Sequence, residues 1–544
     1  MTLSTDRART ERLATFVREL EAELAPLQRA HHEASWRFNI TGDAEAEAES
    51  ARLETAIRTV FARPEPYRML SEIAASGGVD DPSLARQLLL LRNDHQAQQI
   101  PPARIAEMVQ LEKSLESRFN RFRADLDGER VTDNRLKDIL RDSADLALRK
   151  RAWEASKQIG GEVVGELIAL VKMRNQAARD LGFANYYAMM LELDELGLDS
   201  LFATLDQVER GTRPIWNRYK GALDATLAVR FGLSPSDLRP WHYSDPFFQE
   251  APAAEVSLDR WFQGASLEDL TGESFAAVGF DIQDLLARSD LYEKPGKCQH
   301  AFCMCVDRGQ DIRVLCNIRP DERWMSTMLH EFGHAVYDAS VDPSLPYFLR
   351  SHAHILSTEA SAMLFGRLSK CADWLITYAG APESEARTAA DAIARAMRAQ
   401  LLVQTRWELV MCHMERALYE NPDQDLDTRW WDLVERFQNV PRPDRRQAPD
   451  WASKIHFSIA PVYYHNYLLG EMMASQLQAH IQNQVLGGGA DVWKRYVTSP
   501  EVGKYLREKL YRPGRTFDWQ ETLRRATGRA LDPSAFIAEL DGVG

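Results

Sequence analysis

The stretch Met328-Leu-His330-Glu331-Phe-Gly-His334-Ala-Val-Tyr337 is predicted to be helical and contains the pattern His-Glu-x-x-His. Residues four apart in an α-helix lie on one face, about 6 Å apart along the axis. His330 and His334 can therefore offer two ring nitrogens to one metal ion. A catalytic zinc ion takes three protein ligands and keeps one position open for water. The stretch thus predicts two of three zinc ligands.

A glutamate further along the chain is the candidate third ligand. A second amphipathic helix is predicted to begin near Leu356, with Ser357 or Thr358 as its N-cap, which puts Glu359 in its first turn. The alternative is a buried helix whose histidines are merely hydrogen-bonded, but the added glutamate makes a chance occurrence of the whole pattern rarer. We therefore expect one zinc ion.

Glu331 follows the first histidine directly and can point towards the open side of the metal. Zinc lowers the pKa of a bound water to about 7, so a carboxylate of ordinary basicity can complete the activation of that water. Glu331 is the predicted general base, and the predicted reaction class is metal-assisted hydrolysis of a carbonyl compound.

The chain has 544 residues and a formal net charge of −14. Its length exceeds that of one simple core, which predicts two domains or one large domain with a cleft. The acidic balance argues against nucleic acid as a partner. The sequence has no apolar run of about 18 residues to span a bilayer, and no signal-peptide pattern at its N-terminus. We therefore expect a cytoplasmic protein with no membrane partner.

Six cysteines in a chain this long are not the disulfide framework of a small secreted domain. Four of them cluster before the His-Glu-x-x-His helix: Cys298, Cys303, Cys305 and Cys316. A second metal site is one interpretation, but the spacing matches no zinc-ribbon pattern. In a reducing cytoplasm we expect free thiols.

Apolar residues recur with helical period along most of the chain, which predicts an all-α, mainly helical fold. The expected helices are two between residues 4 and 76 with a break near 39–43, and others at 81–100, 102–127, 133–154 and 162–181. The main β signal is a hairpin with strands at 299–306 and 312–318. An edge strand beside the metal helix can hold an extended peptide through main-chain hydrogen bonds.

A polar and aromatic cluster follows a Pro/Arg-rich break at residues 440–446. It places one lysine, two histidines and three tyrosines within fourteen positions, residues 454–467. Any one of these tyrosines taken alone is better explained by helix packing. The cluster as a whole is a candidate for a functional segment.

His-Glu-x-x-His followed by a helical glutamate is typical of gluzincin peptidases, and the chain resembles the angiotensin-converting enzyme (peptidyl-dipeptidase A) family over nearly its whole length. The matching pieces occur in the family's order: Ala34-Ser-Trp36-Arg-Phe-Asn39-Ile-Thr41, Cys298-Gln-His300-Ala301, Cys316, Gly503-Lys-Tyr-Leu506 and Trp519-Gln-Glu-Thr-Leu. The resemblance implies a helical ellipsoid with two lobes, a deep central cleft, zinc at its floor and one small hairpin beside the active site.

The resemblance also implies roles for individual residues. Tyr467 would stabilise the oxyanion, with His456 beside it. Lys454 and Tyr464 would bind the terminal carboxylate of the substrate. His300 and Ala301 would pair with the substrate backbone. These roles agree with the chemistry, because a tetrahedral intermediate needs hydrogen-bond donors and a carboxylate needs a cation.

The chain departs from the family's pattern at three points. Met363 stands where the family usually places an aspartate that orients a zinc histidine. Asn466 replaces an arginine that helps to bind chloride in animal members. The sequence His-Glu-Phe-Gly-His and the number of residues between His334 and Glu359 are closer to those of the related thimet oligopeptidase and oligopeptidase F family.

The predicted function is a zinc-dependent peptidase that releases dipeptides from the C-terminus of oligopeptides. The first alternative is an endopeptidase of the thimet type. Alternatives of other classes are a zinc hydrolase acting on a non-peptide amide, and a non-catalytic, zinc-stabilised peptide-binding protein that would have no need of Glu331. We expect one peptidase unit over 1–544, with a zinc core at 290–370 and a carboxylate and oxyanion segment at 450–480.

Overall fold

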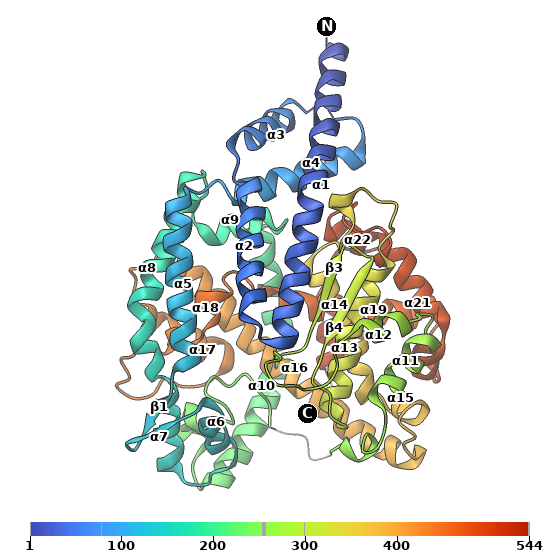
Figure 1. The fold of residues 1–544 in the computed structure, drawn as a ribbon. Helices are drawn as coiled ribbons and strands as arrows, with labels where there is room; N and C mark the ends of the chain where they lie inside the picture. Colours follow the sequence, from blue (N-terminus) through green and yellow to red (C-terminus); the bar gives the residue numbers. More distant parts are fainter. Residues whose placement is uncertain (1, 78, 253–256, 299, 542–544) are drawn as a thin grey trace. The chain divides into compact units, whose positions relative to one another are not determined.

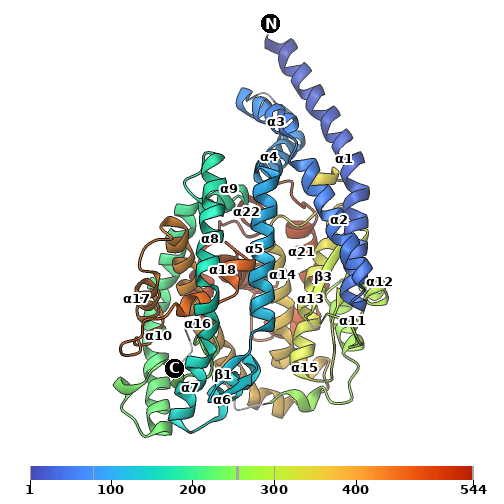
Figure 2. The ribbon, with the colours of Figure 1, turned by 60° about the vertical axis from the view of Figure 1, so that its left-hand side comes forward.

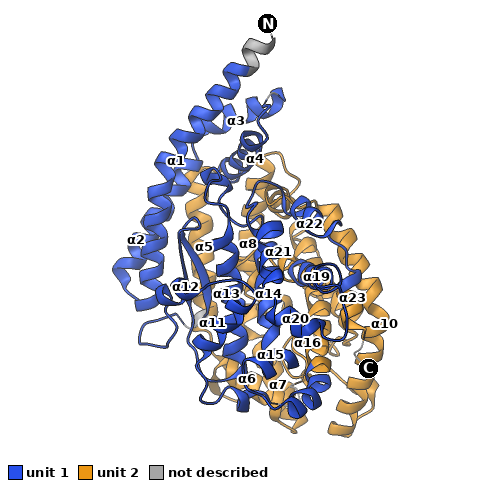
Figure 3. Ribbon diagram, turned by 90° about the vertical axis from the view of Figure 1, so that its right-hand side faces the viewer, with its two compact units in different colours: residues 1–99, 255–393, 469–535 blue, residues 100–254, 394–468, 536–544 orange. Residues whose placement is uncertain are grey.

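The computed structural model describes residues 2–77, 79–252, 257–298 and 300–541, and most of these residues are helical (Figure 1). The chain divides into two compact units, each built from three segments (Figure 3). Unit 1 comprises residues 1–99, 255–393 and 469–535, and unit 2 comprises residues 100–254, 394–468 and 536–544. The predicted all-α class is confirmed.

Unit 1 holds the predicted zinc core. Its elements are α1 (Thr2–Thr41), α2 (Ala44–Phe61), α3 (Pro64–Ser76), α4 (Pro82–Ala97), η3 (Asp259–Trp261), α11 (Leu267–Ala277), α12 (Gln283–Arg288), β3 (Phe302–Asp307), β4 (Asp311–Leu315), α13 (Glu322–Ser340), η4 (Tyr347–Leu349), α14 (Ile355–Gly366), η5 (Arg367–Lys370), α15 (Ala372–Thr377), η7 (Ile481–Val485), α20 (Val492–Thr498), α21 (Pro500–Leu506), η8 (Arg507–Tyr511) and α22 (Trp519–Thr527). Three helices have residues in both units: α16 (Glu383–Glu420), α19 (His465–His480) and α23 (Ser534–Leu540).

The break predicted near residues 39–43 separates α1 from α2. The second helix predicted up to residue 76 is two helices, α2 and α3, because Pro64 begins a new helix. Gly42 has a positive φ of 69°, and the side chain of Asp43 caps α2 by accepting the N–H of Glu45. Helices α1 and α2 pack side by side (Figures 1 and 2). Their apolar faces join α3 and α4 in a cluster that includes Leu13 and Leu70, both fully buried.

The predicted hairpin is β3 paired antiparallel with β4, in the register Phe302↔Leu315 and Cys303↔Val314. The hairpin is shorter than predicted: it begins at Phe302 instead of residue 299 and ends at Leu315 instead of residue 318. His300 and Ala301 precede its first paired residue. Gln299, which the prediction placed in the strand, lies outside the described residues. The hairpin packs on α13, with Val306 and Val314 buried.

Helices α13 and α14 form the most extensive helix pair of unit 1. The carboxylate of Asp321 caps α13 by accepting the N–H of Trp324. The first turn of α14 is capped by His354, whose Nδ1 accepts the N–H of Leu356. The prediction that Ser357 or Thr358 caps this helix is therefore wrong, and Glu359 lies in the second turn.

Unit 2 is built on long helices, of which α5 and α8 run side by side (Figures 1 and 2). Its elements are α5 (Pro102–Arg121), β1 (Ala124–Leu126), β2 (Glu129–Val131), α6 (Asp133–Asp142), α7 (Leu146–Ser156), α8 (Gln158–Asp180), α9 (Tyr186–Leu193), α10 (Leu198–Phe231), η1 (Pro235–Asp237), η2 (Pro240–His242), α17 (Leu426–Gln438), η6 (Asp450–Ser453) and α18 (His456–Ile459).

Two features of unit 2 differ from the predicted helices. The helix expected over 133–154 is two helices, because Asp145 caps a new one by accepting the N–H groups of Ala147 and Leu148. The helix expected over 102–127 ends at Arg121, and β1 and β2 then form a second small hairpin that the sequence analysis did not predict. These strands have only three residues each, too few for a period-two pattern to show.

Candidate metal centre

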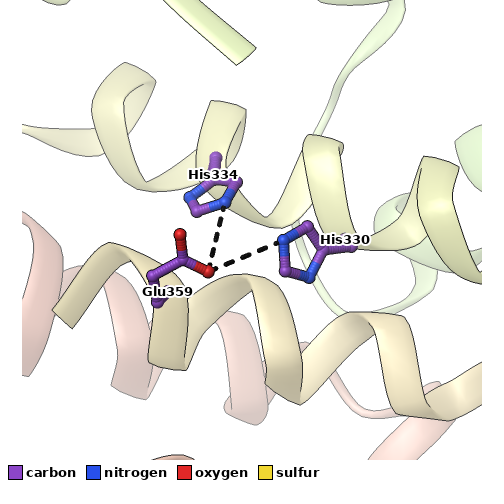
Figure 4. Close-up of side chains that lie close together, drawn as sticks. All are labelled: His330, His334 and Glu359. Carbon is purple, nitrogen blue, oxygen red and sulfur yellow. Dashed lines mark ion pairs between the residues drawn. The ribbon is translucent and has the colours of Figure 1, made fainter. Parts of the chain in front are cut away.

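The two histidines of α13 and the glutamate of α14 converge (Figure 4). Nε2 of His330 lies 3.7 Å and Nε2 of His334 lies 3.9 Å from Oε2 of Glu359. One ligand atom from each of the three residues lies within 4.8 Å of the others. Among the described residues, these three form the cluster of His, Cys, Asp or Glu side chains that could hold a metal ion. The structure thus brings together the three residues that the sequence predicts as zinc ligands.

Glycines allow the helices to approach closely enough for this convergence. A Cβ on Gly333, inside the His-Glu-x-x-His pattern, would lie 2.7 Å from the Cα of Ala362 on α14. A Cβ on Gly366 would lie 3.2 Å from the Cβ of His330. A Cβ on Gly470 of α19 would lie 3.3 Å from the Cβ of Glu359. Backbone packing at these positions therefore fixes where the ligand atoms lie.

The protonation states of the centre suit a cation. Burial lowers the pKa of His330 to about 4, and burial with the neighbouring His330 and His352 lowers the pKa of His334 well below its usual value. Both imidazoles are neutral at neutral pH. Their contacts with Glu359 are therefore not salt bridges, and the three side chains only lie close together. Neutral imidazole nitrogens and a carboxylate oxygen are the donors that zinc takes in catalytic sites. The residues present fit a divalent ion.

Thr358 orients one of these ligands. Nδ1 of His334 lies 2.8 Å from the Oγ1 of Thr358, which leaves Nε2 directed at Glu359. Ligand histidines usually donate their second ring nitrogen to such a partner. This role was not predicted from the sequence, in which Met363 stands where an orienting aspartate was expected. Its only signal was the position of Thr358 directly before Glu359.

Glu331 is buried, with 7% of its surface exposed. Its carboxylate accepts the backbone N–H of Cys303 on β3. Burial, together with the charge of Glu359, raises the pKa of Glu331 to about 8. Burial and the charge of Glu471 raise the pKa of Glu359 to about 7. Two carboxylates held in such surroundings are stabilised in their ionised forms by a bound cation.

A histidine–aspartate pair lies close to the ligands. His352 Nδ1 lies 3.0 Å from the carboxylate of Asp338, a residue of α13 that is 8% exposed. The Coulombic interaction with His352 lowers the pKa of both Glu359 and His334. The pair therefore contributes to the field at the centre.

The predicted carboxylate-binding residues lie in unit 2. Nζ of Lys454 donates to Oε1 of Gln249 at 2.8 Å, and Nε1 of Trp407 donates to the hydroxyl of Tyr464 at 3.0 Å. Burial lowers the pKa of Lys454 to about 8. The contact between Gln249 and Lys454 was not predicted, because 205 residues separate the two in the chain.

His456, Tyr464 and Tyr467 lie together in unit 2. The rings of His456 and Tyr464 are 4.9 Å apart, and those of Tyr464 and Tyr467 are 5.5 Å apart. All three line a pocket of about 210 Å³ whose other walls are Gln249, Glu250, Gln404, Trp407 and Glu408. Tyr467 is half-buried and Tyr464 is buried. These three side chains thus pack against one another and also line the pocket.

Comparison with known proteins places the chain among peptidases. The family model described as peptidase family M3 matches residues 139–542, which include the metal centre and the 454–467 segment. The chain belongs to peptidase family M3. A second family model, described as angiotensin-converting enzyme, matches residues 7–234 of this M3 peptidase. Both families that the sequence resembles are thus represented, over ranges that overlap at residues 139–234.

The M3 peptidase is also similar to a curated protein named thermostable carboxypeptidase 1 from Pyrococcus furiosus. The two are 24% identical over 425 residues, which cover 72% of this chain and 76% of that protein. Family and relative together show a metallopeptidase that acts on peptides. No helix in the described part of the peptidase is long and apolar enough to cross a bilayer.

The remaining site predictions fall beside β3. His300 is exposed and Ala301 half-buried, both in the unpaired stretch before this strand. All six cysteines are free, and Cys298 and Cys316 are not bonded to each other. Burial raises the pKa of Cys305 to about 12 and raises the pKa of Cys303 well above its usual value, so these thiols are not activated.

Proposed function

We propose that this M3 peptidase is zinc-dependent and releases dipeptides from the free C-terminus of short peptides. The observation that carries the zinc chemistry is the convergence of His330, His334 and Glu359 beside the buried Glu331. The specificity for a free C-terminus is supported by Lys454, whose ammonium is bound by a neutral amide and whose neighbours are aromatic.

His330, His334 and Glu359 would hold the ion, with Thr358 fixing the ring of His334. When bound, zinc lowers the pKa of water and polarises a carbonyl group. Glu331 takes the proton from the attacking water and passes it towards the leaving amine. The N–H of Cys303 holds the carboxylate of Glu331 in one orientation, and burial keeps bulk water from solvating it.

Tyr467 is the proposed donor to the carbonyl oxygen as negative charge develops, and His456 supports it from the same pocket. Burial lowers the pKa of His456 to about 4, so its imidazole is neutral and acts as a hydrogen-bond donor rather than as a cation. His300 and Ala301 are proposed to pair with the substrate backbone, because they precede the first paired residue of β3. The thiol of Cys298, which donates weakly to the carbonyl oxygen of His300 at 3.8 Å, would give way to the peptide.

Lys454, Gln249 and Tyr464 form the proposed grip on the terminal carboxylate. The amide oxygen of Gln249 accepts a hydrogen bond from the ammonium of Lys454 in place of water. The indole N–H of Trp407 donates to the hydroxyl of Tyr464 and holds it in position. An ammonium held in this way gains most from an anion. The name of the relative from Pyrococcus furiosus, a carboxypeptidase, supports action at a free C-terminus.

The second candidate is an endopeptidase of the thimet type, which cuts internal bonds. The M3 family match favours it, because that match covers all of the proposed site residues. The two candidates share the zinc chemistry and differ only in whether Lys454 binds a terminal carboxylate.

A pair of decapeptides tests this difference, one with a free C-terminus and the other amidated. Products are identified by mass spectrometry, and kcat/KM is measured for each peptide. We expect dipeptide release from the free peptide and a loss of about thirtyfold or more on amidation, because breaking one side of a buried charge pair is costly. Cleavage of internal bonds at an undiminished rate would favour the endopeptidase.

A variant of Lys454 tests whether this residue binds the terminal carboxylate. Lys454→Ala should reproduce the loss on the free peptide and change the rate on the amidated one very little, because both changes break the same contact. Lys150→Ala, at an exposed lysine of α7 in the same unit, is the control and should behave as the unaltered protein.

A further inference from the structure

The residues proposed for the oxyanion lie on a stretch of unit 2 that joins two helices. The 456–467 segment runs from α18, which ends at Ile459, to the first turn of α19, which begins at His465. Val462 lies between these helices with a φ of 57°. The branched Cβ of valine collides with the backbone at positive φ, so such a residue is a conformational outlier. It persists only where its surroundings hold it in place.

A buried glutamate holds Val462 in this conformation. Oε1 of Glu415, on α16, accepts the N–H of Val462 at 2.7 Å, and only 3% of Glu415 is exposed. Burial raises the pKa of Glu415 to about 8, although the N–H of Val462 and the charge of Arg174 oppose that shift. The carboxyl group is therefore mostly protonated at neutral pH, and its carbonyl oxygen still accepts the hydrogen bond. Without such a contact, a buried carboxyl group would be costly.

An arginine fixes the other end of the segment. The guanidinium of Arg174, on α8, is buried and donates to the carbonyl oxygens of Phe457 at 3.3 Å and Ser458 at 2.7 Å. It also donates to the carboxylate of Glu112 at 2.7 Å. Hydrogen bonds from a charged donor are stronger than those between neutral groups. The backbone of α18 is thus anchored to α8.

The conformation of Val462 sets the direction in which the chain enters α19. The carbonyl oxygen of Tyr463 accepts the N–H of Asn466 at 3.0 Å, so helical hydrogen bonds begin directly after Val462. Tyr467 follows in the first turn of α19 and lines the pocket of about 210 Å³ together with Tyr464. Because α18 is anchored, a change of φ at Val462 would rotate the start of α19 and move the hydroxyl of Tyr467 relative to the pocket.

We propose that Glu415 is a positioning residue: its hydrogen bond to Val462 holds the hydroxyl of Tyr467 where it can donate to the carbonyl oxygen of the substrate. This inference rests on the proposed function, in which Tyr467 stabilises the developing charge. Glu415 does not line the pocket of Tyr467, so it acts through the backbone and not by contact with the substrate. A displacement of about 1 Å in a group of this kind can lower the rate about a hundredfold.

Substitution of Glu415 tests the proposal through the way its effect divides between kcat and KM. Glu415→Leu removes the acceptor and keeps much of the side-chain volume, so we expect kcat to fall at least about tenfold while KM changes by less than about threefold. Glu415→Gln keeps an acceptor oxygen beside a donor, as in the protonated acid, and should keep kcat within about threefold. Glu420→Leu, at the exposed last residue of the same helix, is the control. Zinc content and the thermal midpoint are measured for each variant.

A second substitution tests whether the conformation of Val462 is the cause of the loss. Glycine adopts positive φ without a clash, so Val462→Gly in the Glu415→Leu background should raise kcat at least about threefold. Ala460→Gly in the same background is the matched control, because Ala460 has a φ of −132°, which alanine adopts readily. A recovery no greater than that of the control would overturn the proposal. Glu415→Leu should also add little to the loss caused by Tyr467→Phe, since both changes affect the same hydroxyl.

The failure of this inference and the failure of the proposed function give different results. A folded leucine variant with unchanged kcat, or equal losses in the leucine and glutamine variants, would overturn the role of Glu415 and leave the proposed function intact. If the leucine variant does not fold, Glu415→Asp takes its place, because it withdraws the carboxyl group by one methylene, and an unchanged kcat there would have the same meaning. An unchanged kcat in Tyr467→Phe would overturn the proposed role of Tyr467 and this inference together.

Discussion

Nδ1 of His334 lies 2.8 Å from Oγ1 of Thr358, the residue directly before Glu359. One turn of α14 thus supplies both a proposed metal ligand and the group that orients another ligand. The hydrogen bond holds the His334 ring so that Nε2 faces the centre.

Thr358→Val should weaken zinc binding by about 10- to 100-fold, because partners of ligand histidines typically contribute this much to affinity. The shape of the side chain is kept, so the thermal midpoint of the metal-free protein should change little. Competition with a chromogenic chelator measures the affinity. Thr358→Ser should retain most of it, and an unchanged affinity in the valine variant would contradict the assigned role.

Glu331→Gln should retain zinc and abolish turnover, because the ligand set is intact while the proposed base is lost. Metal analysis of the purified variant and a peptide-cleavage assay give the two measurements. Near-normal activity with zinc present would show that another group acts as the base.

Gly333→Ala should destabilise unit 1 by about 1–3 kcal/mol, the usual effect of overpacking. The added Cβ would lie 2.7 Å from the Cα of Ala362, so α13 and α14 have to separate. Zinc affinity should fall in parallel, because the ligands lie on these two helices. Denaturant unfolding and chelator competition provide the readouts. Gly165→Ala is the matched control, since a Cβ there meets nothing within 4 Å and alanine favours the helix.

The pH dependence of KM should report the charge of Lys454. Burial lowers the pKa of this lysine to about 8, so the ammonium is present below pH 8 and is lost as the pH rises through that value. A bound carboxylate favours the charged form, so KM for free peptides should be constant below about pH 8 and rise above it. The KM of the amidated peptide should show no such rise, and parallel curves for the two peptides would argue against a carboxylate contact.

Tyr467→Phe should lower kcat by roughly a hundredfold with little change in KM, because the hydroxyl is proposed to act only as charge develops on the carbonyl oxygen. Tyr463→Phe is the control, since Tyr463 packs against Tyr467 with ring centroids 5.3 Å apart and does not line the pocket of Tyr467. An unchanged kcat in the Tyr467 variant would shift the role to His456 or Tyr464.

Periodicity predicted the helical character of the chain up to α8, the two helices of the candidate metal centre and the β3–β4 hairpin. It failed where a single polar side chain starts a helix. Asp145 starts a new helix inside the stretch predicted as one, and His354 caps α14 three residues earlier than Ser357. Cap identity depends on which side chain reaches a free N–H group, and histidine is not among the residues that usually do so.

The sequence by itself determined two candidate metal ligands, because i,i+4 spacing on a helix is a local property that places His330 and His334 on one face. It also indicated Glu359, although not its turn of the helix. Only the tertiary structure decided the contacts between residues far apart in the chain: the N–H of Cys303 on Glu331, Gln249 on Lys454, and Glu415 on the N–H of Val462. These contacts depend on how helices and loops pack, and packing is fixed by side-chain shapes over the whole unit and not by the spacing within any one segment.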